Sequence, residues 1–117
     1  MLRAMSCLFC KIVAREIPAD IVLENDHVLA FRDIRPVAPT HVLVIPKMHL
    51  ACIHDAGPSE AALLGEVFLA ARQVADKLGL GGPGYRLVVN NGDDGGQTVH
   101  HLHVHVLGGR GMSWPPG

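Results

Sequence analysis

Apolar residues recur at steps of three and four positions in the middle of the chain, between Ser59 and Gly79. This period is typical of a helix with one apolar face. Ser59 is suited to cap the start of such a helix, and Gly79 to follow its last turn. The pattern predicts one long helix, whose apolar positions are Leu64, Val67, Phe68, Ala71, Val74, Ala75 and Leu78.

Short runs rich in β-branched and apolar residues lie on both sides of this helix and predict strands. A short helix should precede them and end before Ile17-Pro18, because the residue before a proline disfavours helix. Strands that are not separated by alternating helices favour an α+β fold, an antiparallel sheet with its helices on one side. In chain order we expect a helix at Ser6–Arg15, strands at Ile21–Glu24, Val28–Asp33 and His41–Ile45, the long helix, and strands at Tyr85–Asn90 and Val99–Leu107.

The composition fits a single globular domain, residues 1–117, because 49% of the residues are hydrophobic and only 18% are charged. The net charge of −1 gives no long-range field that would attract nucleic acid or anionic lipid. No apolar stretch approaches the roughly 20 residues of a membrane span. Three cysteines without an export signal predict a reducing, cytoplasmic location.

Histidine is the unusual component, with 8 residues in all and four of them between His100 and His105. Alternate side chains of a strand share a face, so His101, His103 and His105 would stand in a row above an apolar opposite face. A histidine-rich surface strand or a metal-binding stripe would give the same pattern. We favour a catalytic row, because one neutral imidazole can attack as a nucleophile while a second donates a proton.

A glycine-rich segment, residues 91–98, leads directly into this row. Its backbone N–H groups can form an anion-binding nest, and Gln97 and Thr98 add side-chain donors. Glycines before a strand usually indicate only a turn. Next to the histidines, however, the segment predicts that a phosphate is held within their reach.

The run from His101 to Leu107 resembles the signature of the histidine triad (HIT) superfamily, in which histidines alternate with apolar residues. Further segments resemble its Hint branch, the nucleoside phosphoramidases, and the resemblance extends from Cys7 to the last residue. It implies a HIT-like fold that dimerises into a continuous sheet through the long helix and the strand after it. The segments are Phe31-Arg32-Asp33-Ile34, Ala38-Pro39-Thr40-His41, Val44-Ile45-Pro46-Lys47, Asp94-Gly95-Gly96-Gln97-Thr98, Leu107-Gly108-Gly109-Arg110 and Trp114-Pro115-Pro116-Gly117.

The resemblance implies a role for each histidine of the site. His103 would attack the α-phosphorus of a nucleotide and become nucleotidylated, and water would then release the monophosphate. His105 would contact the phosphate and help to protonate the departing amine. The backbone carbonyl of His101 would orient the nucleophilic ring, and His41 would lie beside the triad.

The same resemblance implies the substrate contacts. Asp33 would bind the ribose hydroxyls, for which two carboxylate oxygens suit a cis-diol. Trp114 would reach the leaving group of the partner's site, or else anchor the tail in an apolar slot. The phosphate and leaving group would lie at Asn90, Gly96, Gln97 and Thr98. The purine would lie among Leu8, Phe9, Ile12, Phe31, Ile34 and Leu43, each of which is also an ordinary core residue.

The pair Cys7 and Cys10 suits half of a metal site, a redox pair or two reduced thiols. Together with His49 and the first triad histidine, His101, the two cysteines form a set that resembles the metal-site arrangement of some bacterial HIT proteins. Cysteine and histidine ligands fit a closed tetrahedral Zn²⁺ site. We expect a structural zinc ion, because the covalent mechanism requires no cofactor.

These features predict an enzyme that hydrolyses the P–N bond of purine nucleoside phosphoramidates. An alternative is a diadenosine polyphosphate hydrolase, in which the leaving group is a nucleotide. A third possibility is a nucleotide-binding regulatory protein with vestigial catalysis. The expected partners are a purine nucleotide and a second copy of the chain, without nucleic acid or membrane.

Overall fold

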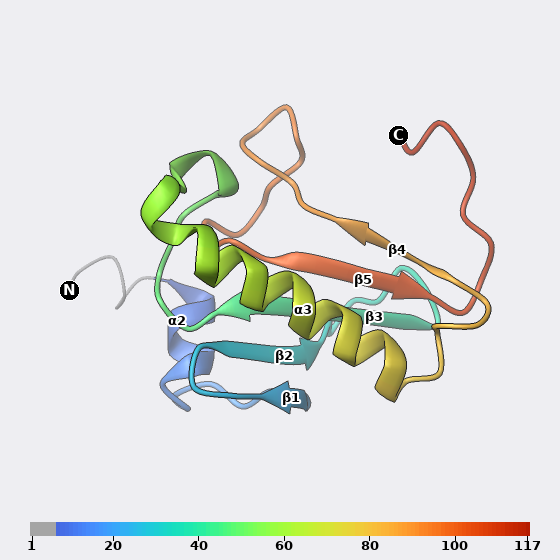
Figure 1. The fold of residues 1–117 in the computed structure, drawn as a ribbon, viewed down its shortest axis with the longest axis horizontal. Helices are drawn as coiled ribbons and strands as arrows, with labels where there is room; N and C mark the ends of the chain where they lie inside the picture. The colour runs from blue at the N-terminus through green and yellow to red at the C-terminus, as the bar shows by residue number, and fades with distance from the viewer. Residues whose placement is uncertain (1–6) are drawn as a thin grey trace.

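The computed structural model describes residues 7–117, which form a five-stranded antiparallel sheet and two α-helices (Figure 1). The strands lie in the order β1-β2-β3-β5-β4, so β1 and β4 are the edges. The α+β class and the antiparallel sheet are thus confirmed. The strands are β1 Ile21–Glu24, β2 Val28–Arg32, β3 Thr40–Pro46, β4 Tyr85–Val88 and β5 Val104–Gly108.

The helices α2 (Leu8–Val13) and α3 (Ala61–Lys77) pack on opposite faces of the sheet, so the prediction that both lie on one side is wrong. In β3, Val42 and Val44 pack in the core with α3, whereas Leu43 and Ile45 pack in the core with α2. Successive residues of a strand face opposite sides, and here both sides are apolar. A strand that is covered on both faces shows no polar alternation from which its two sides could be told apart.

The long helix begins later than the sequence predicts. Ser59 is not its cap, because a 3-10 turn, Pro58–Glu60, precedes it and Glu60 occupies the cap position. Gly79 does follow the last turn, with a φ of +76° that suits glycine. Phe68 faces outward and is 41% exposed, so it belongs to the outer surface of α3 rather than to its core face.

The strand predicted at Val99–Leu107 is shorter than expected, because β5 begins only at Val104. Before it, the N–H of Leu102 donates to the carbonyl of Leu50 (2.6 Å) outside the sheet ladder. His101 and His103 therefore precede the regular strand. Likewise β4 ends at Val88. The helix α2 ends at Val13 rather than Arg15, and the predicted start at Ser6 lies outside the described residues.

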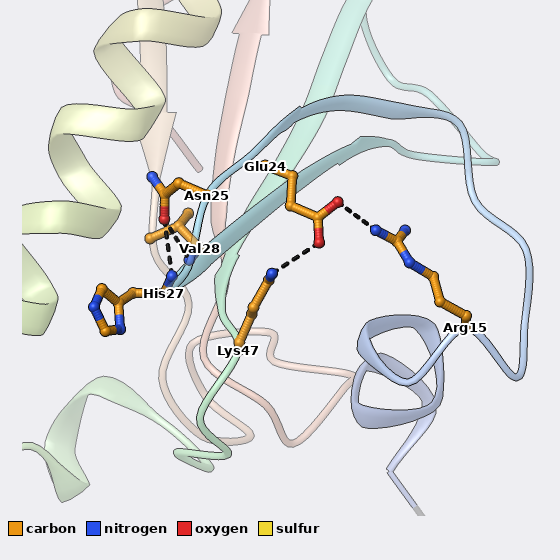
Figure 2. Close-up of polar contacts among 6 residues, drawn as sticks. All are labelled: Arg15, Glu24, Asn25, His27, Val28 and Lys47. Carbon is orange, nitrogen blue, oxygen red and sulfur yellow. Dashed lines mark hydrogen bonds and ion pairs between the residues drawn. The ribbon is translucent and has the colours of Figure 1, made fainter.

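A charged cluster ties the end of α2 to the sheet (Figure 2). Glu24 at the end of β1 pairs with Arg15, which follows α2, and with Lys47, which follows β3 (2.8 Å to Lys47). At the neighbouring turn, the side chain of Asn25 accepts the N–H groups of His27 and Val28. The cluster fixes α2 against the chain that leaves β3. Within residues 7–117, no helix has the length and apolar character to cross a bilayer.

Candidate active site

Three histidine rings meet on the face of the sheet that α2 covers. The register pairs His41 with Leu107 and Leu43 with His105, which places His41 and His105 on the same face. The ring centroids are 4.9 Å apart for His103 and His105, and 5.2 Å apart for His41 and His105. The ring of His101 points instead toward the two cysteines of the N-terminal pair.

Backbone hydrogen bonding fixes the tautomer of His103. Its Nδ1 lies 2.6 Å from the carbonyl oxygen of His101, which can only accept, so Nδ1 carries the proton. The other nitrogen, Nε2, then keeps its lone pair. Burial lowers the pKa of His103, whose ring is 6% exposed and meets the edge of Phe9. The ring is therefore neutral near pH 7 and has a nitrogen available for attack.

A second set of contacts fixes the tautomers of His41 and His105. The N–H of Val37 donates to Nδ1 of His41 (3.2 Å), so the proton of the neutral His41 ring is on Nε2. That proton is donated to Nδ1 of His105 (2.9 Å), which leaves the His105 proton on its own Nε2. Among the described residues this Nε2 is buried and has no hydrogen-bond partner. This series of hydrogen bonds, which starts at the N–H of Val37, therefore leaves the Nε2–H of His105 unused beside the ring of His103.

Asp33, which directly follows β2, completes this group. One carboxylate oxygen accepts the N–H of Arg35 (2.8 Å), and the other lies 3.5 Å from Nε2 of His41. The ligand atoms of Asp33, His41 and His105 lie within 4.8 Å of one another, as a metal site requires. However, Nε2 of His41 carries a proton and offers no lone pair to a metal. We therefore interpret the three residues as a proton relay.

The buried imidazoles make folding depend on pH. Burial lowers the pKa of both His101 and His105 to about 4, below the ordinary value of about 6.5. As the pH falls, the unfolded chain therefore binds protons before the folded chain does. We expect the free energy of unfolding to be constant between about pH 7 and pH 8 and to fall by roughly 2–3 kcal/mol for each of the two rings, roughly 5 kcal/mol in all, between about pH 6.5 and pH 4.

Urea denaturation of the metal-free protein at several pH values measures this loss. Carboxylates also titrate near the acid end, so a His105→Asn variant serves as the control and should lose part of the slope. An unfolding free energy that does not change over this range would contradict the expected protonation.

The four sulfur and nitrogen ligands predicted from the sequence come together at the N-terminus of α2. Nδ1 of His101 lies 3.3 Å from the Cys7 sulfur and 3.5 Å from that of Cys10, and Nδ1 of His49 lies 3.2 Å from Cys10. Tetrahedral zinc, with Zn–S near ~2.3 Å and Zn–N near ~2.0 Å, sets such S···N separations at about 3.5 Å. The donor set and its spacing therefore fit a zinc ion.

His101 connects this centre to the triad. Its Nε2–H donates to the carbonyl of Pro46 (2.8 Å), which leaves Nδ1 unprotonated and directed at the thiols. Its own carbonyl holds His103. Burial, together with the thiol of Cys7, raises the pKa of Cys10 to about 11, so two thiolates here require a cation. One residue thus serves the metal centre through its ring and the nucleophile through its backbone.

Gln97 is committed to the fold rather than free for a phosphate. It is 7% exposed; its oxygen accepts the N–H of Gly92, and its nitrogen donates to the carbonyls of Ala51 and Val99. These bonds tie the glycine-rich turn to the loop after β3. The turn itself needs glycine at position 96, where φ is +81°.

We expect Gln97→Leu to lower the free energy of unfolding by about 2–4 kcal/mol, because three backbone groups would lose their partners. Thermal and urea denaturation measure the change. Gln73→Leu, at an exposed position of α3, is the matched control and should change stability by less than about 0.5 kcal/mol. Equal stability of the two variants would show that the Gln97 bonds contribute nothing.

The residues predicted to hold the purine divide into two groups. Phe9, Ile12, Phe31 and Leu43 are buried together in the core beneath α2. The remaining two are exposed, Leu8 by 45% and Ile34 by 91%. Trp114, which was expected at the partner's leaving group or in an apolar slot, is 82% exposed.

Three phosphate-site residues lie at two different cavities or in the open turn. Thr98 lines a cavity with Cys7 and His49. Asn90 lines another with Arg86 and Arg110. Gly96 is exposed in the turn. Sequence reasoning did not single out Val37, because a backbone N–H gives no sequence signal. It did not single out Arg86 either, although alternation along β4 places Arg86 on the same face as Val88, the register partner of His105.

Comparisons with known proteins agree on one family. A family model described as HIT domain matches residues 14–112. An uncharacterised HIT-like protein of Synechocystis sp. is 55% identical over 97% of this chain and 99% of its own length. A HIT family hydrolase from Legionella pneumophila is 54% identical with a TM-score of 0.94, over 96% of this chain and all of the other. One from Clostridium thermocellum is 48% identical with a TM-score of 0.90, over 92% and 94% of the two chains.

Proposed function

The chain belongs to the HIT domain family, and from this premise we propose that it hydrolyses the P–N bond of purine nucleoside 5′-phosphoramidates and releases the nucleoside monophosphate. The hydrolase names of the two similar structures support the general class. The observation that carries the proposal is the pair of neighbouring ring nitrogens: the free lone pair of His103 and the unpartnered N–H of His105.

In the first step, Nε2 of His103 attacks the phosphorus and the P–N bond breaks. The negative phosphate favours the protonated form of the His41–His105 pair, so the pair takes up a proton from water when substrate binds. His105 passes this proton to the departing nitrogen, which leaves as an amine. The hydrogen bond from Nδ1 of His103 to the carbonyl of His101 stabilises the charge that forms on the attacking ring.

In the second step, water attacks the phosphorus of the nucleotidylated His103. His105, whose Nε2 is now unprotonated, takes a proton from the attacking water, and the His41–His105 pair releases this proton to the solvent when the negative monophosphate leaves. The bond from phosphorus to Nε2 breaks and the nucleoside monophosphate leaves. In this scheme Asp33 holds the ribose, and its carboxylate keeps the His41 ring in place.

A substrate panel with mass spectrometry of the trapped enzyme tests this proposal. Adenosine 5′-phosphoramidate should be hydrolysed faster than diadenosine triphosphate. AMP should be found on His103, attached through an acid-labile bond. A preference for the dinucleotide would transfer the assignment to polyphosphate hydrolysis. Absence of labelled enzyme with every substrate would favour a binding protein.

We also propose a structural zinc ion at Cys7, Cys10, His49 and His101. The spacing of the four donors supports it, and so does the Pro46 carbonyl that fixes the His101 tautomer. Zinc bound there would supply no step of the reaction; it would hold α2 and the His101 backbone in position. A reducing compartment such as the cytoplasm would keep the thiols available.

A second copy of the chain is the proposed partner at the β4 edge. Apolar side chains are exposed there and on the outer surface of α3: Tyr85 by 37%, Phe68 by 41% and Leu69 by 61%. Unpaired edge strands favour pairing with another chain. We expect the protein to sediment as a dimer and Leu69→Glu to shift it toward monomer in analytical ultracentrifugation. Met48→Glu, at an exposed residue after β3, is the control and should stay dimeric.

A further inference from the structure

A cavity of about 510 Å³ lies beside the proton relay, and the proposed mechanism does not yet use it. The register pairs Val88 with His105 and Arg86 with Leu107, so Arg86 and Val88 face the same side of the sheet as His105. The cavity wall continues into the segment after β5, which turns back toward the β4 edge (Figure 1). The lining residues are Arg86, Val88, Asn90, Gly95, Leu107, Arg110, Met112, Ser113, Pro116 and Gly117.

The charged side chains that line this cavity are all cationic. Arg86 and Arg110 line it, and no aspartate or glutamate does. Within residues 7–117, neither guanidinium makes an ion pair. Arg86 donates to the carbonyl of Ser113 (2.9 Å), and Arg110 to those of Gly111 (3.1 Å) and Val37 (3.0 Å). A guanidinium carries more N–H groups than these bonds use, so both retain donors for an anion.

One residue joins the cavity to the relay. The carbonyl of Val37 accepts from Arg110, and its N–H donates to His41, which in turn holds His105. Val88, in the cavity wall, is the register partner of His105, so the cavity also lies next to the strand position that carries the proton donor of the leaving group.

We propose that this cavity is the leaving-group subsite and that it selects amines bearing an anionic group, a carboxylate or a phosphate. The inference rests on the proposed phosphoramidase function. The anion pairs with Arg86 and Arg110, while the nitrogen bonded to phosphorus faces His105. The charge of this anionic group does not change during the reaction. Its contact with the two arginines therefore stabilises substrate and transition state equally, and lowers KM more than it raises kcat.

Binding to an inactive enzyme tests the subsite without turnover. In a His103→Asn background, calorimetry compares AMP joined through its P–N bond to the amine of β-alanine, to that of β-alaninamide, and to that of aminoethylphosphonate. We expect the two anionic compounds to bind about tenfold more tightly than the neutral amide, as a charged hydrogen-bonded contact provides. Arg86→Gln and Arg110→Gln should each reduce this ratio, and the double variant should bring it near unity. Tighter binding of the phosphonate compound than of the carboxylate compound would identify phosphate as the preferred anion.

Arg72→Gln is the matched control, because Arg72 lies on α3, on the opposite face of the sheet, paired with Asp76. It should keep the full ratio. Equal affinity for the three compounds in the His103→Asn protein would overturn the subsite. So would a ratio unchanged in the double variant, provided that its melting temperature matches that of the parent.

Turnover by the wild-type enzyme separates this inference from the function on which it rests. If no phosphoramidate labels His103 but the affinity ratio persists, the cavity binds anions and the phosphoramidase function is wrong. If all three compounds are hydrolysed with equal KM, the function stands and the subsite is wrong.

Discussion

His103→Asn is expected to abolish nucleotidyl-enzyme formation and to lower kcat on adenosine 5′-phosphoramidate by at least about 10⁴-fold. The only free lone pair that the triad offers to phosphorus is on Nε2 of His103, since the neighbouring His105 nitrogen carries a proton. An amide side chain is not a nucleophile, but its size is close enough to leave the pocket intact. Affinity for AMP should therefore stay within a few-fold of wild type.

Single-turnover assays with labelled substrate measure the first effect, and calorimetry with AMP measures the second. His27→Asn is the matched control, because His27 is exposed at the β1–β2 turn outside the triad (Figure 2) and should leave the rate unchanged. Turnover by His103→Asn above one per cent of the wild-type rate would refute the covalent mechanism.

Cys7→Ser should remove the bound metal and lower the free energy of unfolding by about 3–5 kcal/mol. Cys7 is the cap of α2, where its sulfur accepts the N–H of Cys10 (3.3 Å) and lies 3.3 Å from Nδ1 of His101. A serine oxygen is a poorer ligand for zinc than a thiolate, and the remaining donors leave the tetrahedron open. Because the carbonyl of His101 orients His103, kcat should fall as well.

Elemental analysis of the purified protein gives the metal content, with one zinc per chain expected for the wild type. Guanidinium denaturation with and without a chelator gives the stability, and the chelator should affect only the wild type. Cys52→Ser is the control, because Cys52 lies outside the four-ligand cluster and should retain the metal. Wild-type protein without stoichiometric metal would contradict the assignment.

The sequence carried the fold because the fold depends on local periodicities. The three- and four-residue steps from Val67 to Ala75 place buried positions on one side of α3, and β-branched runs mark the strands wherever they pair. Glycine adopts a positive φ more readily than other residues, so the presence of Gly79 was enough to predict the end of the helix. The family, and with it the candidate nucleophile, could also be recognised from the alternation that begins at His101.

The chemistry of the site was decided by the tertiary structure. Which nitrogen of His103, His41 or His101 is free follows from backbone groups of His101, Val37 and Pro46, and only the path of the chain brings these groups within hydrogen-bond distance. Strand alternation would have placed His101 beside the other two rings, but the regular strand starts after it. The cationic cavity likewise arises because β4 and the C-terminal segment meet beside β5. Periodicity is a property of neighbouring residues, whereas proton positions and cavities depend on contacts between residues distant in sequence.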